Sequence, residues 1–468
     1  MKKIIYTVIL FSAMMFTSCE SYLDIQPKGQ IILKEVEEYN NIFNDDWFLF
    51  DNYYANIPVG TTDEYWPYDA QWFIDNPNTT ASANFLWDET VDRVSVTLED
   101  LFYNKAYERI SRFNIIIQEV LDAEGSEDDK REAYAKAKVL RAFNHFLLVN
   151  YYAKQYNAAT AATDNGIIVI KTFDMEQTPV QSSVQDAYDF ILKDINDAIP
   201  DLKDKTENTM HPSKAFGYAL LAKVNLFMGK YNEALEAANK SLEINHYVND
   251  LVDAHNNSTP GYFTPNLPGS YNAADYLYYA GGAWGQPLST IVSEEAINRF
   301  SPDETGVSGD IRLDDFYSSP YWIPGATFRL YMQYGEYKHV GGGISVAEVM
   351  LMKAECLSRG GDATGAMKIV NDLRELRILP DVYTPLTATN AKDAVRIVIA
   401  ERARELMNTL NRFWDIRRLA NDADYKIELS KEFNGQTYSV DPAKSHIFIM
   451  PFPKNVTDKN PDLKQNTK

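Results

Sequence analysis

The stretch SKAFGYALLAKVNLFMGKYNEALEAANKSLEI (residues 213–244) decides the fold of this chain. Its small and apolar residues recur at the offsets of a tetratricopeptide repeat, in which two antiparallel helices cross closely around a glycine turn. One such helix pair cannot bury its own apolar face, so the stretch predicts a scaffold of stacked pairs. The residues at these offsets are Leu221, Ala222, Gly229, Tyr231, Ala234 and Ala238.

A second copy of the pattern lies 134 residues further on, in AEVMLMKAECLSRGGDATGAMKIVNDLREL (347–376), with Ala354, Gly361, Ala366 and Val370 at matching offsets. Three more segments carry apolar residues at helical spacing: 99–122, 128–153 and 183–202. The third opens on a serine with an acid three residues later, which is typical of a helix N-terminus. We therefore expect an all-α dominated chain, a single domain of tetratricopeptide-like helix pairs.

Residues 245–342 differ from the rest, because they are rich in Gly, Pro, Asn, Ser and Tyr and show little helical period. A disordered linker would be poor in aromatic residues, and this segment is full of them. It is predicted to be a long ordered insertion that gives the domain a loop-rich, aromatic-rich ligand-binding half, because function is concentrated on such loops.

The N-terminus, MKKIIYTVILFSAMMFTSCES, has two lysines, a short apolar run and small residues before Cys19. That order is typical of a secretory signal, and a cysteine at the cleavage point is typical of a bacterial lipoprotein. We expect residues 1–18 to be removed and Cys19 to carry the lipid, which would anchor the protein to a membrane. Cys356 would then be the remaining cysteine, and its apolar helical surroundings predict a buried hydrophobic side chain.

The charge balance argues against nucleic-acid binding. The chain has 66 acidic and 45 basic residues, a formal net charge of −21. Such a surface repels phosphate backbones, and no basic patch with interleaved aromatics opposes it.

No catalytic constellation is present in the sequence, so we do not expect an enzyme. The metalloprotease, nucleotide-binding and nucleophile-elbow motifs are missing, and the six histidines are scattered. The carboxylate pairs Asp63–Glu64 and Asp314–Asp315 could serve a glycosidase, but adjacent acids arise by chance in so acidic a chain. The charges of ERARELMNTLNRFWDIRR (401–418) are interpreted as salt bridges along and between helices.

The segment DEYWPYDAQWF (63–73), hereafter the aromatic segment, follows neither the helical nor the strand period. Flat sugar faces stack on aromatic rings while sugar hydroxyls pair with Asp, Asn, Gln and Arg side chains, so rings on ordered loops suit a glycan. Tyr276–Tyr279 are further rings in the insertion. The alternative interpretation, that these rings pack the loops onto the helices, stays open. The predicted ligand-binding residues are Asp63, Glu64, Trp66, Tyr68, Trp72, Trp284, Tyr321, Trp322 and Arg329.

Several segments together resemble the SusD/RagB family: LDIQPKG (23–29), KAKVLRAFNHFLLVNYY (136–152), both repeat copies, residues 401–418 and PFPKNVTDKNPDLKQN (451–466). The resemblance covers nearly the whole of residues 19–468, with an N-terminal part of about 20–244, the insertion at about 245–342 and a C-terminal part of about 343–468. It implies a cell-surface outer-membrane lipoprotein of Bacteroidetes-type bacteria. Such proteins bind nutrients, usually glycans, without cleaving them and deliver them to a SusC-type TonB-dependent transporter.

Two alternatives remain at this stage. Some relatives capture peptides for the same type of transporter, and a repeat scaffold can also serve as a protein-interaction module. No cofactor is expected, although acidic loop residues leave a structural calcium ion open. The closing NPDLKQN (460–466) is interpreted as a turn that docks back on the body of the protein.

Overall fold

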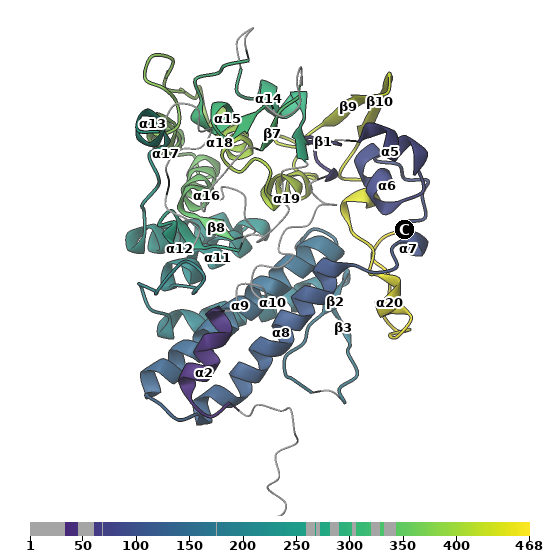
Figure 1. The fold of residues 1–468 in the computed structure, drawn as a ribbon, viewed down its shortest axis with the longest axis vertical. Helices are drawn as coiled ribbons and strands as arrows, with labels where there is room; N and C mark the ends of the chain where they lie inside the picture. The colour runs from purple at the N-terminus through teal and green to yellow at the C-terminus, as the bar shows by residue number, and fades with distance from the viewer. Residues whose placement is uncertain are drawn as a thin grey trace, which may run out of the picture.

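The computed structural model describes residues 33–44, 60–67, 69–174, 176–258, 267, 272–280, 290–301, 306–319, 328–331 and 343–468. Helices dominate this part of the chain, and its strands are short (Figure 1). None of the helices in these ranges is long and apolar enough to cross a membrane.

Three long helices form the first layer, and each begins at a side-chain cap. They are α8 (Leu101–Glu119), α9 (Glu127–Tyr152) and α10 (Val184–Ala198), and α9 packs against both of the others. The serines at 126 and 183 accept hydrogen bonds from the backbone N–H three residues on, which satisfies donors that a helix start leaves free. The three helices predicted from periodicity are confirmed. Helix α9 is buried on nearly every side, since its C-terminal half lies in the centre of the core.

The two repeat copies form the predicted helix pairs and stack on each other (Figure 1). The first pair is α11 (Lys214–Phe227) and α12 (Tyr231–Ile244), and the second is α16 (Val346–Arg359) and α17 (Ala363–Glu375). Helix α12 packs on α16, so the small residues of both pairs are buried at the crossings. Helix α18 (Ala391–Glu405) packs on α16 and α17, and α19 (Leu410–Arg418) follows it.

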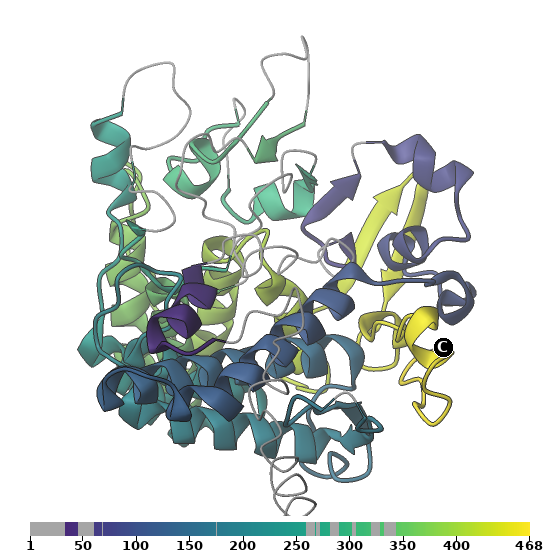
Figure 2. The ribbon, with the colours of Figure 1, turned by 60° about the horizontal axis from the view of Figure 1, so that its bottom comes forward.

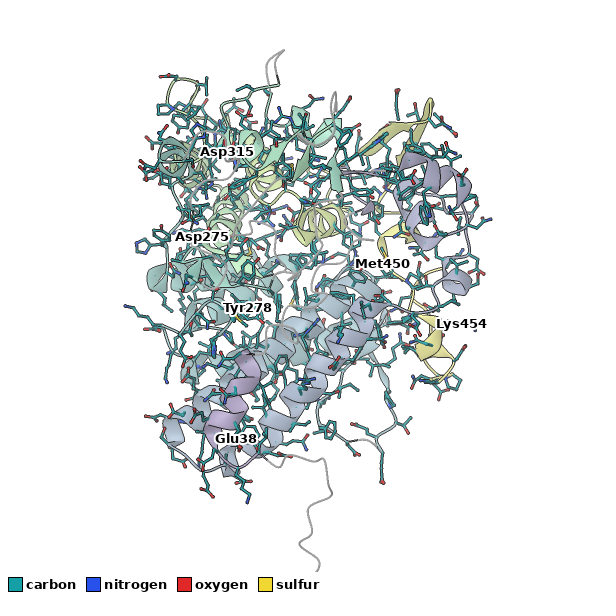
Figure 3. All side chains as sticks on the ribbon, in the orientation of Figure 1. Glu38, Asp275, Tyr278, Asp315, Met450 and Lys454 are labelled. Carbon is teal, nitrogen blue, oxygen red and sulfur yellow. The ribbon has the colours of Figure 1, made fainter. Side chains whose placement is uncertain are left out.

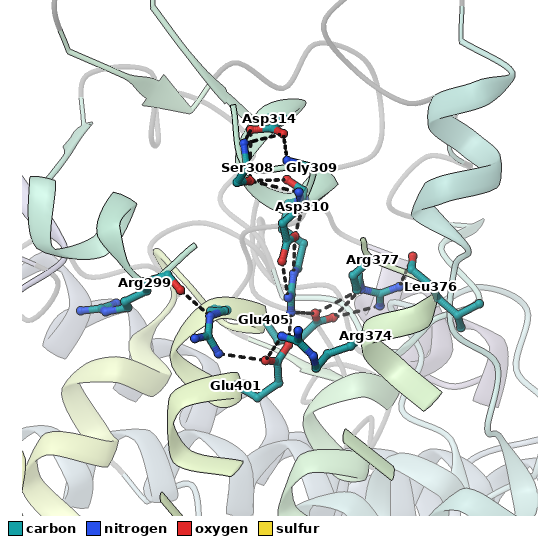
Figure 4. Close-up of polar contacts among 12 residues, drawn as sticks. Arg299, Ser308, Gly309, Asp310, Asp314, Arg374, Leu376, Arg377, Glu401 and Glu405 are labelled. Carbon is teal, nitrogen blue, oxygen red and sulfur yellow. Dashed lines mark hydrogen bonds and ion pairs between the residues drawn. The ribbon is translucent and has the colours of Figure 1, made fainter. Parts of the chain in front are cut away.

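A buried ion network ties the insertion to α18 (Figure 4). Arg312, on the short helix α15 (Ile311–Asp314), pairs with Glu401 at 2.7 Å and with Glu405 at 2.8 Å. Arg377 pairs with Glu405 at 2.9 Å. The prediction that the charges of residues 401–418 form salt bridges between helices is confirmed.

The strands fall into four small sheets. The largest has the order β1-β5-β7-β6 and consists of β1 (Tyr65–Pro67), β5 (Thr290–Val292), β7 (Leu330–Tyr331) and β6 (Tyr317–Ser318), all antiparallel to their neighbours. The two-stranded sheets pair β2 (Asn165–Ile168) with β3 (Gln181–Ser183), β4 (Tyr276–Tyr278) with β8 (Ile344–Ser345), and β9 (Leu429–Phe433) with β10 (Gln436–Val440).

The remaining short helices connect these units. They are α2 (Val36–Asn41), α5 (Ala70–Asp75), α6 (Thr80–Leu86), α7 (Arg93–Val96), α13 (Leu251–Asn256), α14 (Glu294–Asn298) and α20 (Lys454–Thr457), with 3-10 turns η3 (Ile42–Asn44), η4 (Val120–Asp122), η5 (Ile199–Asp201) and η7 (His446–Phe448). Figure 2 shows α5 and α6 beside the β9–β10 hairpin, apart from the long helices.

Tyr276–Tyr279 are core residues and are not available to a ligand. Tyr278, which is labelled in Figure 3, is fully buried, and its ring lies 5.8 Å from that of Phe143 and 4.8 Å from that of Phe216. Tyr276 and Tyr279 are also buried. The packing interpretation therefore holds for these rings, because β4 lies directly on the helices. Cys356 is a free, buried cysteine, as predicted.

The C-terminal segment docks on the body of the protein as predicted. The side-chain amide of Asn466 donates to the carbonyl oxygens of Tyr152 at 2.8 Å and Gly166 at 2.9 Å. The backbone N–H of Lys464 donates to the side chain of Gln181 at 3.0 Å. These contacts join residues 464–466 to the end of α9 and to the β2–β3 sheet.

Candidate ligand-binding site

The aromatic segment begins at two carboxylates that anchor it to distant parts of the chain. Asp63 accepts two hydrogen bonds from Arg412, at 2.8 and 2.5 Å, and pairs with Arg299 at 2.8 Å. Glu64 pairs with Arg299 at 2.8 Å and accepts the backbone N–H of Asn408 at 3.0 Å. Both carboxylates are therefore held by groups of α19, its preceding turn and the residue after α14.

The two carboxyl groups respond differently to the same burial. Burial would raise the pKa of Asp63, but the guanidinium groups of Arg412 and Arg299 outweigh it and hold that pKa well below its usual range. Burial raises the pKa of Glu64, and its pairing with Arg299 only partly offsets this. In this arrangement both predicted ligand-binding acids engage protein groups.

Strand β1 makes the aromatic segment part of the four-stranded sheet. Tyr65 lies opposite Val292 and Trp66 opposite Ile291, while Ile291 lies opposite Leu330 on the next strand. Every strand of this sheet other than β1 comes from the insertion, so the sheet joins the early loop to the predicted ligand-binding half.

Most rings of the aromatic segment surround Phe85 of α6. The rings of Tyr65 and Trp66 each lie 6.0 Å from that of Phe85, edge to face, and the ring of Phe73 lies 5.0 Å from it. The half-buried ring of Trp66 also packs 5.5 Å from that of Phe433 on β9. These three rings hold the loop, and they leave only part of their surface for a ligand.

Trp72 differs from them, because its side chain is 41% exposed. Asp69 fixes its position by capping α5, with its carboxylate accepting the backbone N–H of Trp72 at 3.0 Å. The ring of Trp72 rests on that of Phe73, 5.1 Å away. An exposed ring held on a capped helix is ready to stack against a flat ligand.

Arg329 joins two loops of the insertion. Its guanidinium donates to the carbonyl oxygen of Tyr317 at 3.0 Å and to that of Gly306. Burial lowers its pKa, and Asp314 opposes that shift. The four other predicted binding residues, Tyr68, Trp284, Tyr321 and Trp322, lie outside the described residues, as does Cys19.

A strand of the four-stranded sheet precedes or follows each of these four residues in the sequence. Tyr68 directly follows β1, Trp284 precedes β5, and Tyr321 and Trp322 stand between β6 and β7 in the chain. Since β1, β5, β7 and β6 are the four strands of one sheet, three segments far apart in the sequence begin or end there.

A groove of about 870 Å³, the hairpin groove, lies between α5–α6 and the β9–β10 hairpin. Phe73, Trp87 and Tyr438 contribute aromatic surface to it, and Asp88 and Glu89 contribute carboxylates. We did not predict this groove or its hairpin from the sequence, although an Asn-Gly pair between alternating residues in KEFNGQTYSV (431–440) is a strong hairpin signal.

Lys431 of the hairpin is buried between two rings. Its ammonium lies 4.1 Å from the ring centre of Phe85 and 4.0 Å from that of Trp87, and it has no hydrogen-bond partner among the described residues. Burial lowers its pKa to about 7, despite the opposing effect of Asp63. Attraction between the cation and both ring faces offsets part of the cost of burying it.

The second predicted carboxylate pair, Asp314–Asp315, lies in the insertion and is also bound by other groups of the protein. Asp315 pairs with His255 at 2.8 Å, and Asp314 accepts the backbone N–H groups of Ser308 and Gly309. Within the described ranges, no group of three or more His, Cys, Asp or Glu side chains could hold a metal ion.

Two family models match the chain. One, described as starch-binding associating with outer membrane, matches residues 25–226, and the other, described as the SusD family, matches residues 344–468. Together they cover more than two thirds of the sequence. A curated relative, SusD-like protein P38 of Formosa agariphila, is 24% identical over 504 residues, covering 92% of this chain and 93% of the relative.

Solved structures share the fold over almost the whole chain. A SusD superfamily protein of Bacteroides thetaiotaomicron has a TM-score of 0.71 at 17% identity and covers 93% of this chain and 100% of its own. Surface glycan-binding protein A of Bacteroides uniformis has a TM-score of 0.66 at 15% identity and covers 92% and 98%. The two family models together match most of the sequence, and the chain therefore belongs to the SusD family.

Proposed function

We propose that this protein binds a glycan at the cell surface without cleaving it and delivers it to a SusC-type TonB-dependent transporter. The observation that carries the proposal is the four-stranded sheet, which joins strand β1 of the aromatic segment to three strands of the insertion. A chain of sugar rings offers several flat faces in a row, which suits a binding face that is rich in aromatic residues.

The exposed ring of Trp72 and the hairpin groove support a carbohydrate in particular. Trp72 offers an apolar face, and Phe73 connects it to a groove that also carries the hydroxyl and amide groups of Thr437 and Gln436. Sugars need both kinds of surface. The surface glycan-binding protein of Bacteroides uniformis, which has the same fold, is consistent with this ligand class.

Binding without cleavage is supported by the ion pairs that the two adjacent carboxylate pairs form within the protein. Glycoside hydrolysis needs one carboxyl group to donate a proton and another to attack or to activate water. Asp63 and Glu64 share Arg299, and Asp315 is paired with His255, so neither adjacent pair is free for such a role in this structure. Lipid anchoring through Cys19 would place this binding face at the outer membrane, beside the transporter.

The experiment is a screen of the purified chain in native gels cast with individual polysaccharides, with peptide mixtures tested in parallel by calorimetry. Retardation by a polysaccharide, with no peptide heat and no release of shorter sugars, is the expected result. Peptide heat without any retardation would replace the glycan by a peptide ligand. Co-purification with a large barrel protein tests the transporter separately.

A further inference from the structure

A second cavity, of about 480 Å³, lies on the part of the molecule where the chain ends, and we call it the C-terminal cavity. Its walls are the loop after α9, the end of α19, the segment after β10 and residues 465–468. Its described lining includes the basic side chains Lys154, Arg417, Lys444 and Lys468, with Asp164 as its acidic one. A basic cavity is unexpected in a chain of net charge −21.

Arg417 is the buried cation of this cavity, with a side chain that is almost completely covered at 3% exposure. One of its two terminal nitrogens, Nη2, donates to the carbonyl oxygen of Ala153, and the guanidinium lies 5.5 Å from the ring centre of Phe413. The other, Nη1, has no hydrogen-bond partner among the described residues, and no carboxylate in that part of the chain pairs with Arg417.

The neighbouring arginines of α19, Arg412 and Arg418, differ from Arg417 because each has a carboxylate partner. Arg412 is paired with Asp63, and Arg418 is paired with Glu355 at 2.7 Å and with Asp415 at 2.7 Å. Their carboxylate partners outweigh burial and raise the pKa of both guanidinium groups. Burial instead lowers the pKa of Arg417 to about 10. The same helix therefore carries two neutralised arginines and one that is not.

Arg93 shows how a buried guanidinium is satisfied without a carboxylate. Its two terminal nitrogens donate to three backbone carbonyls and to the side chains of Asn84 and Thr467. Arg417 has one such carbonyl, at the C-terminal end of α9. A helix end supplies only about half a negative charge, so this contact leaves most of the positive charge of Arg417 uncompensated.

We propose that the C-terminal cavity binds an oxyanion, with Arg417 as its buried cation and Lys154 and Lys444 at its rim. A guanidinium offers paired N–H donors that match two oxygens of a carboxylate, sulfate or phosphate. Lys154 pairs with Asp164 at 2.7 Å, and its ammonium has further donors for a ligand. The oxyanion is either a free inorganic ion or the acid group of an acidic sugar. Arg417 and Lys154 are not part of the aromatic segment, so the proposal stands apart from the function proposed above.

The test is calorimetry of the full chain with sodium phosphate and with sodium glucuronate, using glucose as the uncharged counterpart. We expect saturable binding of at least one anion and none of glucose. Arg417→Lys keeps the charge but loses the paired donors, and it should weaken binding about tenfold or more. Lys154→Met should weaken it about threefold to fivefold.

Lys392→Met is the matched control. Lys392 is 63% exposed against 59% for Lys154, it pairs with Asp424 at 2.8 Å, and neither Lys392 nor Asp424 is among the residues that line the cavity. Its replacement should leave anion binding unchanged. The surface variants Lys154→Met and Lys392→Met keep the comparison informative even if Arg417→Lys folds poorly.

The outcomes separate the sources of the anion. Binding of phosphate alone assigns the cavity to a free ion, binding of glucuronate alone assigns it to an acidic sugar, and binding of both supports a general oxyanion site. The proposal is overturned if neither anion binds, if glucose binds equally well, or if Lys154→Met matches Lys392→Met. Arg417 would then serve only to cap the end of α9.

Discussion

Replacing Asp63 by asparagine tests how the aromatic segment is held in place. Asp63 is the carboxylate that neutralises Arg412, whose side chain is only 9% exposed. Asparagine keeps the size of the side chain and one acceptor oxygen but removes the charge. The variant leaves a buried guanidinium without its ion pair, which costs about 3–5 kcal/mol of unfolding free energy when one partner of such a pair is removed.

The pH dependence of this loss follows from the depressed pKa of Asp63. A carboxylate whose pKa is lowered on folding contributes stability that is fully present above its unfolded value of 3.8 and is lost as the pH falls below it. The difference between wild type and Asp63→Asn should therefore be constant from about pH 7 to pH 5 and shrink below about pH 4.

Urea unfolding followed by circular dichroism measures this difference, with Asp69→Asn as the matched control. Asp69 lies in the same segment, but its role is to cap α5, which asparagine performs about equally well. The control should stay within about 0.5 kcal/mol of wild type. If Asp63→Asn unfolds at the same urea concentration as Asp69→Asn, the anchoring role assigned to Asp63 is wrong.

Three further changes probe the hairpin and the ring cluster. Lys431→Met should raise the unfolding free energy at pH 7 by on the order of 3 kcal/mol, because burial lowers the pKa of Lys431 from 10.5 to about 7 and makes its charged form costly. This gain should vanish as the pH rises towards 10.5, where the ammonium loses its proton in the unfolded chain as well. Urea titrations that show an equal gain at pH 7 and pH 10.5 would contradict this prediction. Phe85→Ala should cost about 3–5 kcal/mol, whereas the exposed Trp72→Ala should cost less than about 1 kcal/mol, and similar thermal midpoints for the two variants would rule out the cluster as the support of the loop. Gly435→Ala should cost about 1 kcal/mol in urea because Gly435 has a φ of 74° with open space around it, and an unchanged midpoint would show that the turn relaxes without cost.

The helical scaffold could be predicted because its signals are local. Apolar residues at steps of three and four mark α8, α9 and α10, and the small residues of the two repeat copies mark the close crossings. Each signal lies within one or two helices. The hairpin of β9 and β10 was equally local, and its Asn-Gly turn could have been found by the same kind of reasoning.

The roles of Asp63 and Glu64 could not be predicted, because they depend on partners far away in the chain. Arg412 lies 349 residues beyond Asp63, and Arg299 lies 235 residues beyond Glu64. The composition of the aromatic segment suggested a ligand for these acids, and only the folded arrangement shows that arginines already engage them. For the rings, the local pattern could not separate exposed Trp72 from half-buried Trp66, because that difference is set by Phe85 and Phe433.

The most direct test of glycan binding through the aromatic segment compares two exposed rings. Trp72 is 41% exposed on the segment, and Phe173 is 42% exposed in the loop between β2 and β3. Retention of Trp72→Ala and Phe173→Ala is measured in gels containing whichever polysaccharide retards the wild type. We expect Trp72→Ala to run faster, with binding weakened about fivefold or more, and Phe173→Ala to run with the wild type. Equal retention of both variants would show that the ring of Trp72 does not bind the glycan.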